Sequence, residues 1–190
     1  MRKIPTLFVR DSKDRRYVTE EVTPGCEWVI GGEGVATRKY DGTCVMLDED
    51  GKWWARREVK PGKIAPPNWR HVESDIATGK SVGWEPIEQS GFAKFHAEAL
   101  GAGGYARSFL PGTYELCGPK INGNPENVEA HQLVRHGADE VWIPLNPDQG
   151  LIAYTVRWWG TEGIEGVVWR HPDGRMAKLK ARDYPSEATR

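Results

Sequence analysis

Four short segments of the chain carry residue types that could act together on a phosphate ester. They are KYDG at 39–42, ELCG at 115–118, EGVVW at 165–169 and KLK at 178–180. A lysine amine is a nucleophile only after it loses its proton, and neighbouring cations, burial and a divalent ion favour that loss. Carboxylates such as Glu165 and Asp41 suit a divalent ion. The set predicts attack by Lys39 on the α-phosphate of a nucleoside triphosphate, with pyrophosphate leaving.

Two of these segments are expected to face each other across a β-hairpin. Asp173-Gly174 is a strong turn signal between IEGVVWR and RMAKLKA. A two-residue turn there predicts three cross-strand pairs on one face: Val167 with Lys180, Trp169 with Lys178, and Glu165 with Arg182. A partly buried face of this kind needs anions beside its cations, which a nucleotide phosphate would supply. A solvated face with weak ion pairs is the alternative.

A second hairpin is expected at Asp50-Gly51, between TCVMLDE and KWWARRE. Its two-residue turn predicts Arg56 opposite Val45 and Arg57 opposite Cys44. Arginine suits bidentate phosphate contact, and an exposed strand charge is the alternative. Because side chains alternate along a strand, only one of the two arginines reaches the inner face, and either one remains possible.

These segments resemble the motifs of the covalent nucleotidyltransferases, the superfamily of polynucleotide ligases and mRNA capping enzymes. ATRKYDGTCVML is similar to their nucleophile motif, and the Glu-bearing strand, the Glu-Gly strand and the Lys-x-Lys follow in order over residues 36–184. TYELCGPKI and IEGVVWRHPDGRMAKLKARDY resemble RNA ligases more than DNA ligases, in particular the 5′–3′ RNA ligases related to vertebrate RNA ligase.

The resemblance implies a role for each matching residue. Lys39 would form a lysyl–AMP, and the backbone of Arg38 would lie against the adenine edge. Asp41 and Gly42 belong to the nucleophile motif. The other implied roles are phosphate contact by Arg56 or Arg57, ribose binding by Glu115, metal binding by Glu165 and Asp41, and α-phosphate binding by Lys178 and Lys180. An adenine-stacking ring is expected between Asn127 and Trp142.

The activity implied is that of an ATP-dependent RNA ligase that needs Mg²⁺ or Mn²⁺ and acts in RNA repair. Lys39 would be adenylylated, AMP would pass to an RNA 5′-phosphate, and an RNA 3′-hydroxyl would then displace it. A DNA ligase, an mRNA guanylyltransferase and a non-catalytic RNA-binding relative are the alternatives. Retention of Lys39 together with Glu115, Glu165, Lys178 and Lys180 argues against the last of these.

The elements that must position these residues are mostly strands. Hairpin signals outnumber helical patterns, which predicts an α+β fold with antiparallel sheets flanked by helices. Helices are expected over Glu88–Leu100, ended by the glycines of GAGG, and over Asp148–Trp159, with Asp148 as N-cap and Gly160 beyond the end. WVI at 28–30 and GTYELCG at 112–118 are expected as strands, and residues 59–69 as a loop. The resemblance implies one ligase adenylation (ATP-grasp-like) domain over residues 1–190, without an appended C-terminal domain.

Composition narrows the class of protein. The chain has 190 residues, with 26 basic and 27 acidic side chains and a formal net charge of −1. This balance excludes a protein that coats RNA through a global positive field, so RNA is expected on a local cationic face. Three widely spaced cysteines, with no CxxC pair, predict a reducing cytoplasm. No apolar run suits a signal peptide or a membrane span, and a monomer is expected.

Two further features have alternative interpretations. The first sixteen residues carry six basic side chains, expected as a solvated surface or, less readily, as a phosphate-contacting arm. Nine tryptophans suggest stacking on single-stranded RNA. For the pairs Trp53-Trp54 and Trp158-Trp159, however, at least one member of each is expected in the core.

Overall fold

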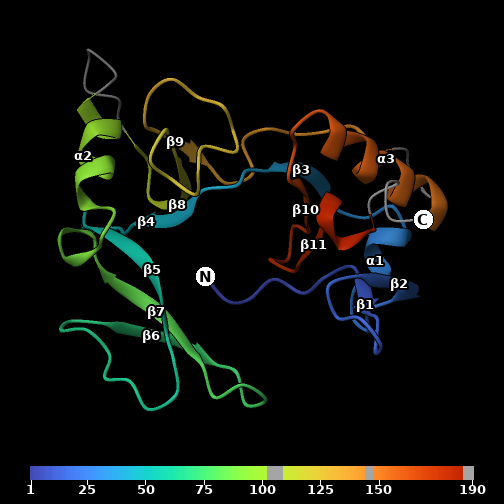
Figure 1. Cartoon of the computed structure of the whole chain (residues 1–190), viewed down its shortest axis with the longest axis horizontal. Helices are drawn as coiled ribbons and strands as arrows, with labels where there is room; N and C mark the ends of the chain where they lie inside the picture. The colour runs from blue at the N-terminus through green and yellow to red at the C-terminus, as the bar shows by residue number, and fades with distance from the viewer. Residues whose placement is uncertain (102–108, 144–147, 186–190) are drawn as a thin grey trace. The chain divides into compact units, whose positions relative to one another are not determined.

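The computed structural model describes residues 1–101, 109–143 and 148–185. The described part has a mixed α+β fold, with its antiparallel strands arranged in three sheets (Figure 1). The chain forms two compact units. Unit 1 contains Met1–Lys3 and Asp41–His136, and unit 2 contains Ile4–Tyr40 and Gly137–Arg190. The chain therefore passes from one unit to the other between Tyr40 and Asp41, inside the KYDG segment.

Unit 1 is built on a six-stranded antiparallel sheet with the strand order β6-β7-β5-β4-β8-β9. The strands are β4 Thr43–Leu47, β5 Trp53–Val59, β6 Arg70–Ser74, β7 Ser81–Pro86, β8 Gly112–Cys117 and β9 Gln132–Arg135. The 3₁₀ turn η1 (Ile87–Gln89) and helix α2 (Ala93–Gly101) follow β7.

The two faces of this sheet differ in character. Val45, Ala55 and Tyr114 lie on one face, in a buried cluster that also includes Ala99 of α2. Since side chains alternate along each strand, Cys44 and Glu115, which are cross-strand partners, lie on the opposite face. This buried cluster therefore occupies one face, whereas the other face carries Glu115 together with the buried rings of Trp54 and Trp84.

Unit 2 combines a two-stranded and a three-stranded sheet with two helices. Strands β1 (Phe8–Arg10) and β2 (Val18–Val22) pair, and β10 (Gly166–Arg170) lies between β11 (Met176–Lys180) and β3 (Val35–Lys39). The helices are α1 (Glu27–Ile30) and α3 (Gln149–Thr161), and η2 (Ala181–Asp183) is a 3₁₀ turn. Helix α3 contributes Ile152, Val156 and Trp159 to a cluster with Val167 and Leu179 of the sheet.

Several predicted elements are confirmed. Both hairpins form, as β4–β5 and β10–β11, and the GTYELCG segment forms β8. Asp148 is the N-cap of α3, and its side chain accepts a hydrogen bond from the amide of Leu151 at 2.6 Å. Within the described residues, no helix is long and apolar enough to cross a membrane.

The register of both hairpins differs from the prediction by one residue. Asp48 and Lys52 close the first loop, and His171 and Arg175 close the second, so each loop has three residues instead of two. The third loop residue is a glycine with positive φ, 76° at Gly51 and 92° at Gly174. This is the arrangement of a type I turn followed by a left-handed residue. Val45 therefore pairs with Ala55, and Val167 with Leu179.

The helix predictions need three corrections. WVI, predicted as a strand, lies in helix α1, because a three-residue apolar run has no periodicity that distinguishes a helical turn from a strand. Helix α2 begins at Ala93 rather than Glu88, since the carbonyl and hydroxyl of Ser90 form local hydrogen bonds that interrupt the helix. Gly160 lies inside α3, where an ideal Cβ would be 2.5 Å from the Cβ of Ala181. Most of the glycines expected to end α2 lie in 102–108, outside the described residues.

Candidate active site

The three-stranded sheet of unit 2 brings three lysines to one face. Gly166 in the central strand pairs with Lys39 of β3 on one side and with Lys180 of β11 on the other. Lys178 lies two residues before Lys180, on the same face. The predicted pairing of these lysines with Val167 and Trp169 is wrong, since the three-residue loop turns both apolar side chains into the core on the opposite face.

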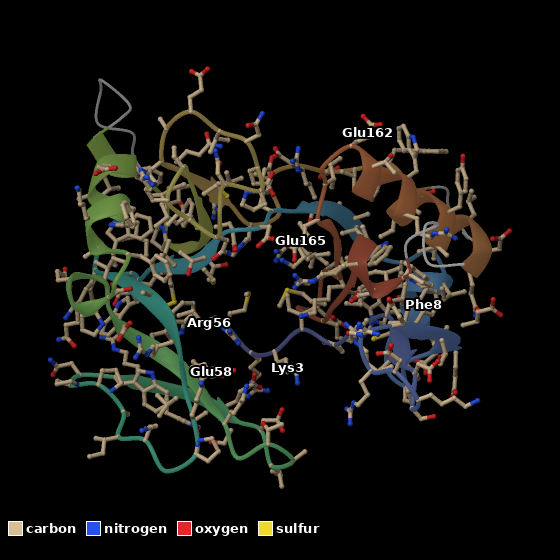
Figure 2. The ribbon with its side chains drawn as sticks, in the orientation of Figure 1. Lys3, Phe8, Arg56, Glu58, Glu162 and Glu165 are labelled. Carbon is tan, nitrogen blue, oxygen red and sulfur yellow. The ribbon has the colours of Figure 1, made fainter. Side chains whose placement is uncertain are left out.

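Glu165 is the anion at the centre of these cations. It is the residue directly before β10 (Figure 2), and its side chain is 7% exposed. Oε2 is 2.5 Å from Nζ of Lys39, and Oε1 is 2.5 Å from Nζ of Lys180 and 3.8 Å from Nη2 of Arg182. Burial opposes ionisation of this carboxyl, but the two lysine cations outweigh burial and hold its pKa below the usual value. Glu165 therefore stays ionised and links strands β3 and β11.

Gly166 permits this close arrangement. An ideal Cβ at this position would lie 2.1 Å from the carbonyl oxygen of Leu179 and 2.7 Å from Cα of Lys180. Both neighbours are backbone atoms, which cannot move aside without disturbing the strand pairing. Gly166 thus lets β11 approach β10 closely, and the preceding residue, Glu165, supplies the carboxylate beside this close approach.

Lys178 is deprotonated more easily than an ordinary lysine. Its burial, together with the charges of Lys180 and Lys39, lowers the pKa of Lys178 to about 8. Three lysine cations face one carboxylate here, so the face carries an excess of positive charge. Such a face can bind a polyphosphate, which would compensate the cations.

Asp41 and Gly42 belong to unit 1. The amide of Gly42 donates a hydrogen bond to Oε1 of Glu115 at 3.1 Å, and an ideal Cβ at Gly42 would lie 2.3 Å from the carbonyl oxygen of Leu116. Asn122 donates to the Gly42 carbonyl at 2.7 Å and to Oδ1 of Asp41 at 3.3 Å. The glycine therefore allows the Asp-Gly turn to lie directly against strand β8.

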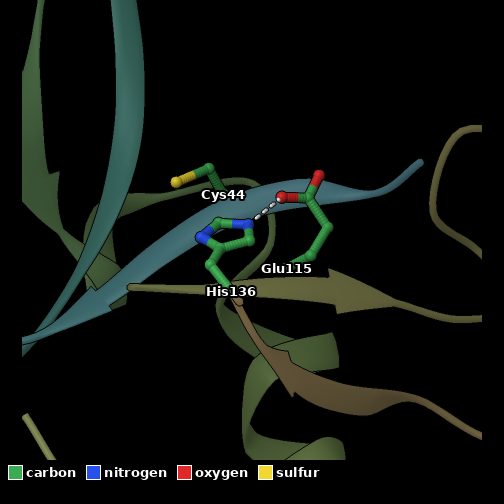
Figure 3. A group of neighbouring side chains, drawn as sticks. All are labelled: Cys44, Glu115 and His136. Carbon is green, nitrogen blue, oxygen red and sulfur yellow. Dashed lines mark hydrogen bonds and ion pairs between the residues drawn. The ribbon is translucent and has the colours of Figure 1, made fainter. Parts of the chain in front are cut away.

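The other carboxylate oxygen of Glu115 takes part in a series of hydrogen bonds between side chains (Figure 3). Oε2 lies 2.8 Å from Nε2 of His136, whose Nδ1 lies 2.9 Å from Oγ1 of Thr113. Ligand atoms of Cys44, Glu115 and His136 lie within 4.8 Å of one another. This mixed donor set is of the kind that a zinc-like ion accepts, although the hydrogen bond between Glu115 and His136 already joins two of its members.

The structure distinguishes between the two arginines of β5. Val45 pairs with Ala55 on the core face, so Arg56 lies on the other face, the one that carries Glu115 (Figure 2). Among the described residues, none accepts a hydrogen bond from the buried Nε of Arg56. Arg57 instead lies on the opposite face, 3.7 Å from Oε1 of the buried Glu85. Arg56 is therefore the arginine placed to contact an anion beside Glu115.

The region expected to supply an adenine-stacking ring contains three candidates. His131 stacks on Phe95 and hydrogen-bonds Glu98 of α2, on the core side of unit 1. Trp142 belongs to unit 2. His136 is the ring that contacts Glu115. The Arg38 amide, expected against the adenine edge, donates to the carbonyl of Asp139 at 2.8 Å.

Sequence reasoning missed several residues of these two groups. Asn122, Glu126 and His136 contact Asp41, Gly42 or Glu115, and of the three only His136 lies in a region chosen from the sequence, the one expected to supply an adenine-stacking ring. Asn122-Gly123 is a turn signal that could have pointed to the loop after β8. The remaining predicted site residues fall into a lysine group in unit 2 and a Glu115 group in unit 1.

Neither a family model nor a curated protein matches the chain. The geometry of the two groups therefore carries the functional argument.

Proposed function

We propose that the protein is an ATP-dependent RNA ligase whose nucleophile is Lys39. The observation that carries the proposal is the position of Lys39 on one sheet face with Lys178 and Lys180, paired at 2.5 Å with the buried Glu165. The neighbouring lysine cations favour the neutral amine that can attack a phosphate, whereas the paired carboxylate favours the ammonium form.

In the proposed first step, Lys39 loses its ammonium proton to solvent and the neutral Nζ attacks the α-phosphorus of ATP, with the second proton released to solvent as the P–N bond forms. The new P–N bond forms as the bond to the β-phosphate oxygen breaks, and pyrophosphate leaves. Lys178 and Lys180 would compensate the negative charge of the α-phosphate, and Glu165 holds Lys39 before the attack. The AMP then moves to the 5′-phosphate of RNA, which regenerates the amine, and an RNA 3′-hydroxyl displaces it to seal the strand.

Glu165 is also a residue that would hold Mg²⁺ or Mn²⁺, and the resemblance implies the same role for Asp41. Its carboxylate supplies the oxygen ligands that these ions prefer, and such an ion supplies charge neutralisation at the phosphates. Because the same two oxygens pair with Lys39 and Lys180, a cation at Glu165 would compete with both lysines. This competition favours release of the Lys39 amine for attack.

The residues of unit 1 have binding roles in the proposal. Glu115 would bind the ribose hydroxyls, and its hydrogen bonds to the Gly42 amide and to His136 hold the carboxylate in a single orientation. Arg56 would contact phosphate, in keeping with its position on the face of Glu115. The proposal further places the enzyme in the cytoplasm as a monomer.

Nucleotide labelling tests the proposal. The protein is incubated with α-labelled ATP or GTP and Mg²⁺ or Mn²⁺, then denatured and examined for covalent label. We expect acid-labile label from ATP, released pyrophosphate, and none of either with Lys39→Arg. Arginine keeps a cation beside Glu165 but is a far poorer nucleophile, so loss of label does not reflect loss of the ion pair. Lys60→Arg, at an exposed site in unit 1, is the matched control.

The outcomes separate the alternatives. Absence of label from every nucleotide rules out the enzyme and favours a non-catalytic RNA-binding protein. Label from GTP alone identifies a guanylyltransferase. With label from ATP, joining of 5′-phosphorylated RNA strands distinguishes an RNA ligase from a DNA ligase, which would join only DNA strands.

A further inference from the structure

Helix α3 and the segment after β11 enclose a groove in unit 2 that the proposed chemistry leaves unused. The groove has a volume of about 670 Å³. Its lining comes from the second half of α3, from η2 and from the two residues after η2, and it includes Tyr154, Arg157, Trp158 and Arg182.

Two aromatic side chains of the groove are unusually exposed. Tyr154 is 69% exposed and Trp158 is 53% exposed, whereas the adjacent Trp159 is 8% exposed and belongs to the core. Tyr154 and Trp158 are four residues apart on α3, so their side chains lie on the same face of the helix. The buried Trp159 already anchors this part of α3, so packing within unit 2 does not explain the two exposed rings.

The charges of the groove favour an anionic ligand. Two arginines, Arg157 and Arg182, belong to the lining, and none of the described lining residues carries a carboxylate. Nη2 of Arg182 also lies 3.8 Å from Oε1 of Glu165, the carboxylate paired with Lys39. Within unit 2 the groove therefore adjoins the lysine group.

We propose that this groove binds single-stranded RNA, with Tyr154 and Trp158 stacking on bases and Arg157 and Arg182 contacting phosphates. A polynucleotide is the ligand class that presents flat rings and negative charges in alternation, which matches this combination of aromatic and cationic side chains. The assignment rests on the proposed ligase activity for its biological meaning. It adds the surface that holds the RNA strand close to Lys39.

RNA binding by the full chain tests the assignment. The dissociation constant for a fluorescein-labelled, 5′-phosphorylated single-stranded oligoribonucleotide is measured by anisotropy for wild type, Tyr154→Ala, Trp158→Ala and Trp158→Phe. Loss of one stacked base weakens binding by about tenfold. We expect that loss for each alanine variant and little change for Trp158→Phe, which keeps an aromatic ring. Label from α-labelled ATP should remain at the wild-type level in all of them.

Trp142→Ala is the matched control, since Trp142 is 80% exposed in the same unit and does not line the groove. Wild-type affinity in the Tyr154→Ala, Trp158→Ala double variant overturns the assignment. A dimer that sediments in the wild type but not in this variant also overturns it, because a second copy would then occupy the groove. If ATP leaves no label on the wild type but the alanine variants still lose RNA affinity, the ligase proposal fails and the groove assignment stands.

Discussion

At the scale of single residues, Glu165 is expected to stabilise the protein through its two ion pairs. It is nearly buried and neutralises Lys39 and Lys180, each at 2.5 Å. Removal of one partner from a buried ion pair leaves an uncompensated charge, which costs more than the pair itself contributes. We therefore expect Glu165→Gln to lower the free energy of unfolding by about 3 kcal/mol at neutral pH. Urea unfolding followed by circular dichroism measures this difference.

The pH dependence of this difference distinguishes a charge effect from a packing effect. The folded-state pKa of Glu165 is lower than usual, so its ionised form stabilises the protein above the ordinary carboxyl pKa of about 4.3. That stabilisation is lost as the pH falls through the lower folded-state value. Wild type and Glu165→Gln should therefore converge in stability under acidic conditions. A difference that stays constant from neutral to acidic pH contradicts the ion-pair account.

Lys178 provides a second prediction, because the pKa of this amine is lowered to about 8. We expect its ¹³Cε resonance to titrate near pH 8 in the free protein. Burial is the largest cause and the charge of Lys180 is the next, so Lys180→Gln should raise the midpoint without restoring the usual lysine value. A wild-type midpoint near 10.4, or a lower midpoint in the variant, contradicts this account.

The same lowered pKa affects binding and stability in opposite directions. Lys178 loses its charge as the pH rises through about 8, so triphosphate affinity should begin to fall there. Between this value and the usual lysine pKa, the unfolded chain binds more protons than the folded one. The contribution of Lys178 to stability therefore improves as the pH rises through this interval.

At the scale of elements, the approach of β11 to β10 depends on Gly166. A methyl group there would lie 2.1 Å from the Leu179 carbonyl oxygen, so the two strands must separate beside Lys180. We expect Gly166→Ala to destabilise the protein by about 2 kcal/mol or more and to abolish covalent labelling by ATP. Chemical unfolding and labelling measure the two effects.

Gly91→Ala is the control for this substitution, since nothing lies within 4 Å of an ideal Cβ at Gly91. Its stability should stay within about 0.5 kcal/mol of wild type. Wild-type stability and labelling in Gly166→Ala would show that the strands tolerate the separation and that the close approach has no role in the site.

The β-hairpins could be predicted from the sequence, whereas their register could not. The Asp-Gly pairs at 50–51 and 173–174 mark both turns correctly. Each glycine is the third loop residue rather than the second, and a shift of one residue exchanges the two faces of a strand. This is why Val167 and Trp169 were expected beside the lysines and lie in the core instead.

The sequence predicted the contacts that motif residues of the candidate site make with one another. It did not predict the contacts that loop residues add. Lys39, Glu165 and Lys180 come together as their motifs suggest. Asn122 and His136 reach the Glu115 group through contacts that only the folded sheet creates. No local sequence signal specifies such long-range contacts.

At the scale of the whole molecule, each compact unit has its own buried cluster, so each should resist local unfolding separately. Leu116 in β8 and Leu179 in β11 are both fully buried strand residues, one in each unit. We expect Leu116→Ala to destabilise unit 1 by about 3 kcal/mol and to accelerate amide hydrogen exchange there about 100-fold. Leu179→Ala should do the same in unit 2. Equal acceleration in both units for either variant would show that the chain unfolds as a single cooperative structure.

The net charge of −1 sets the last prediction, because an overall neutral protein has no global field to hold RNA. The N-terminal basic segment is partly neutralised within the protein, through Lys3–Asp75, Arg10–Asp183 and Arg16–Asp14. RNA affinity should therefore depend on a few local cations. For single strands, a plot of the logarithm of the binding constant against the logarithm of the salt concentration has a slope of about −0.7 for each phosphate neutralised.

Arg182→Gln should then reduce the slope of this salt dependence by about 0.7, because one phosphate contact is lost in the groove. Arg16→Gln should leave the slope unchanged, since Arg16 is paired with Asp14 at 2.6 Å and lies outside the groove. Anisotropy titrations over a range of KCl concentrations measure both slopes. A reduced slope for Arg16→Gln but not for Arg182→Gln would show that RNA binds to the N-terminal segment instead of the groove. The salt dependence thus locates the cationic surface that a nearly neutral protein must have in order to bind RNA.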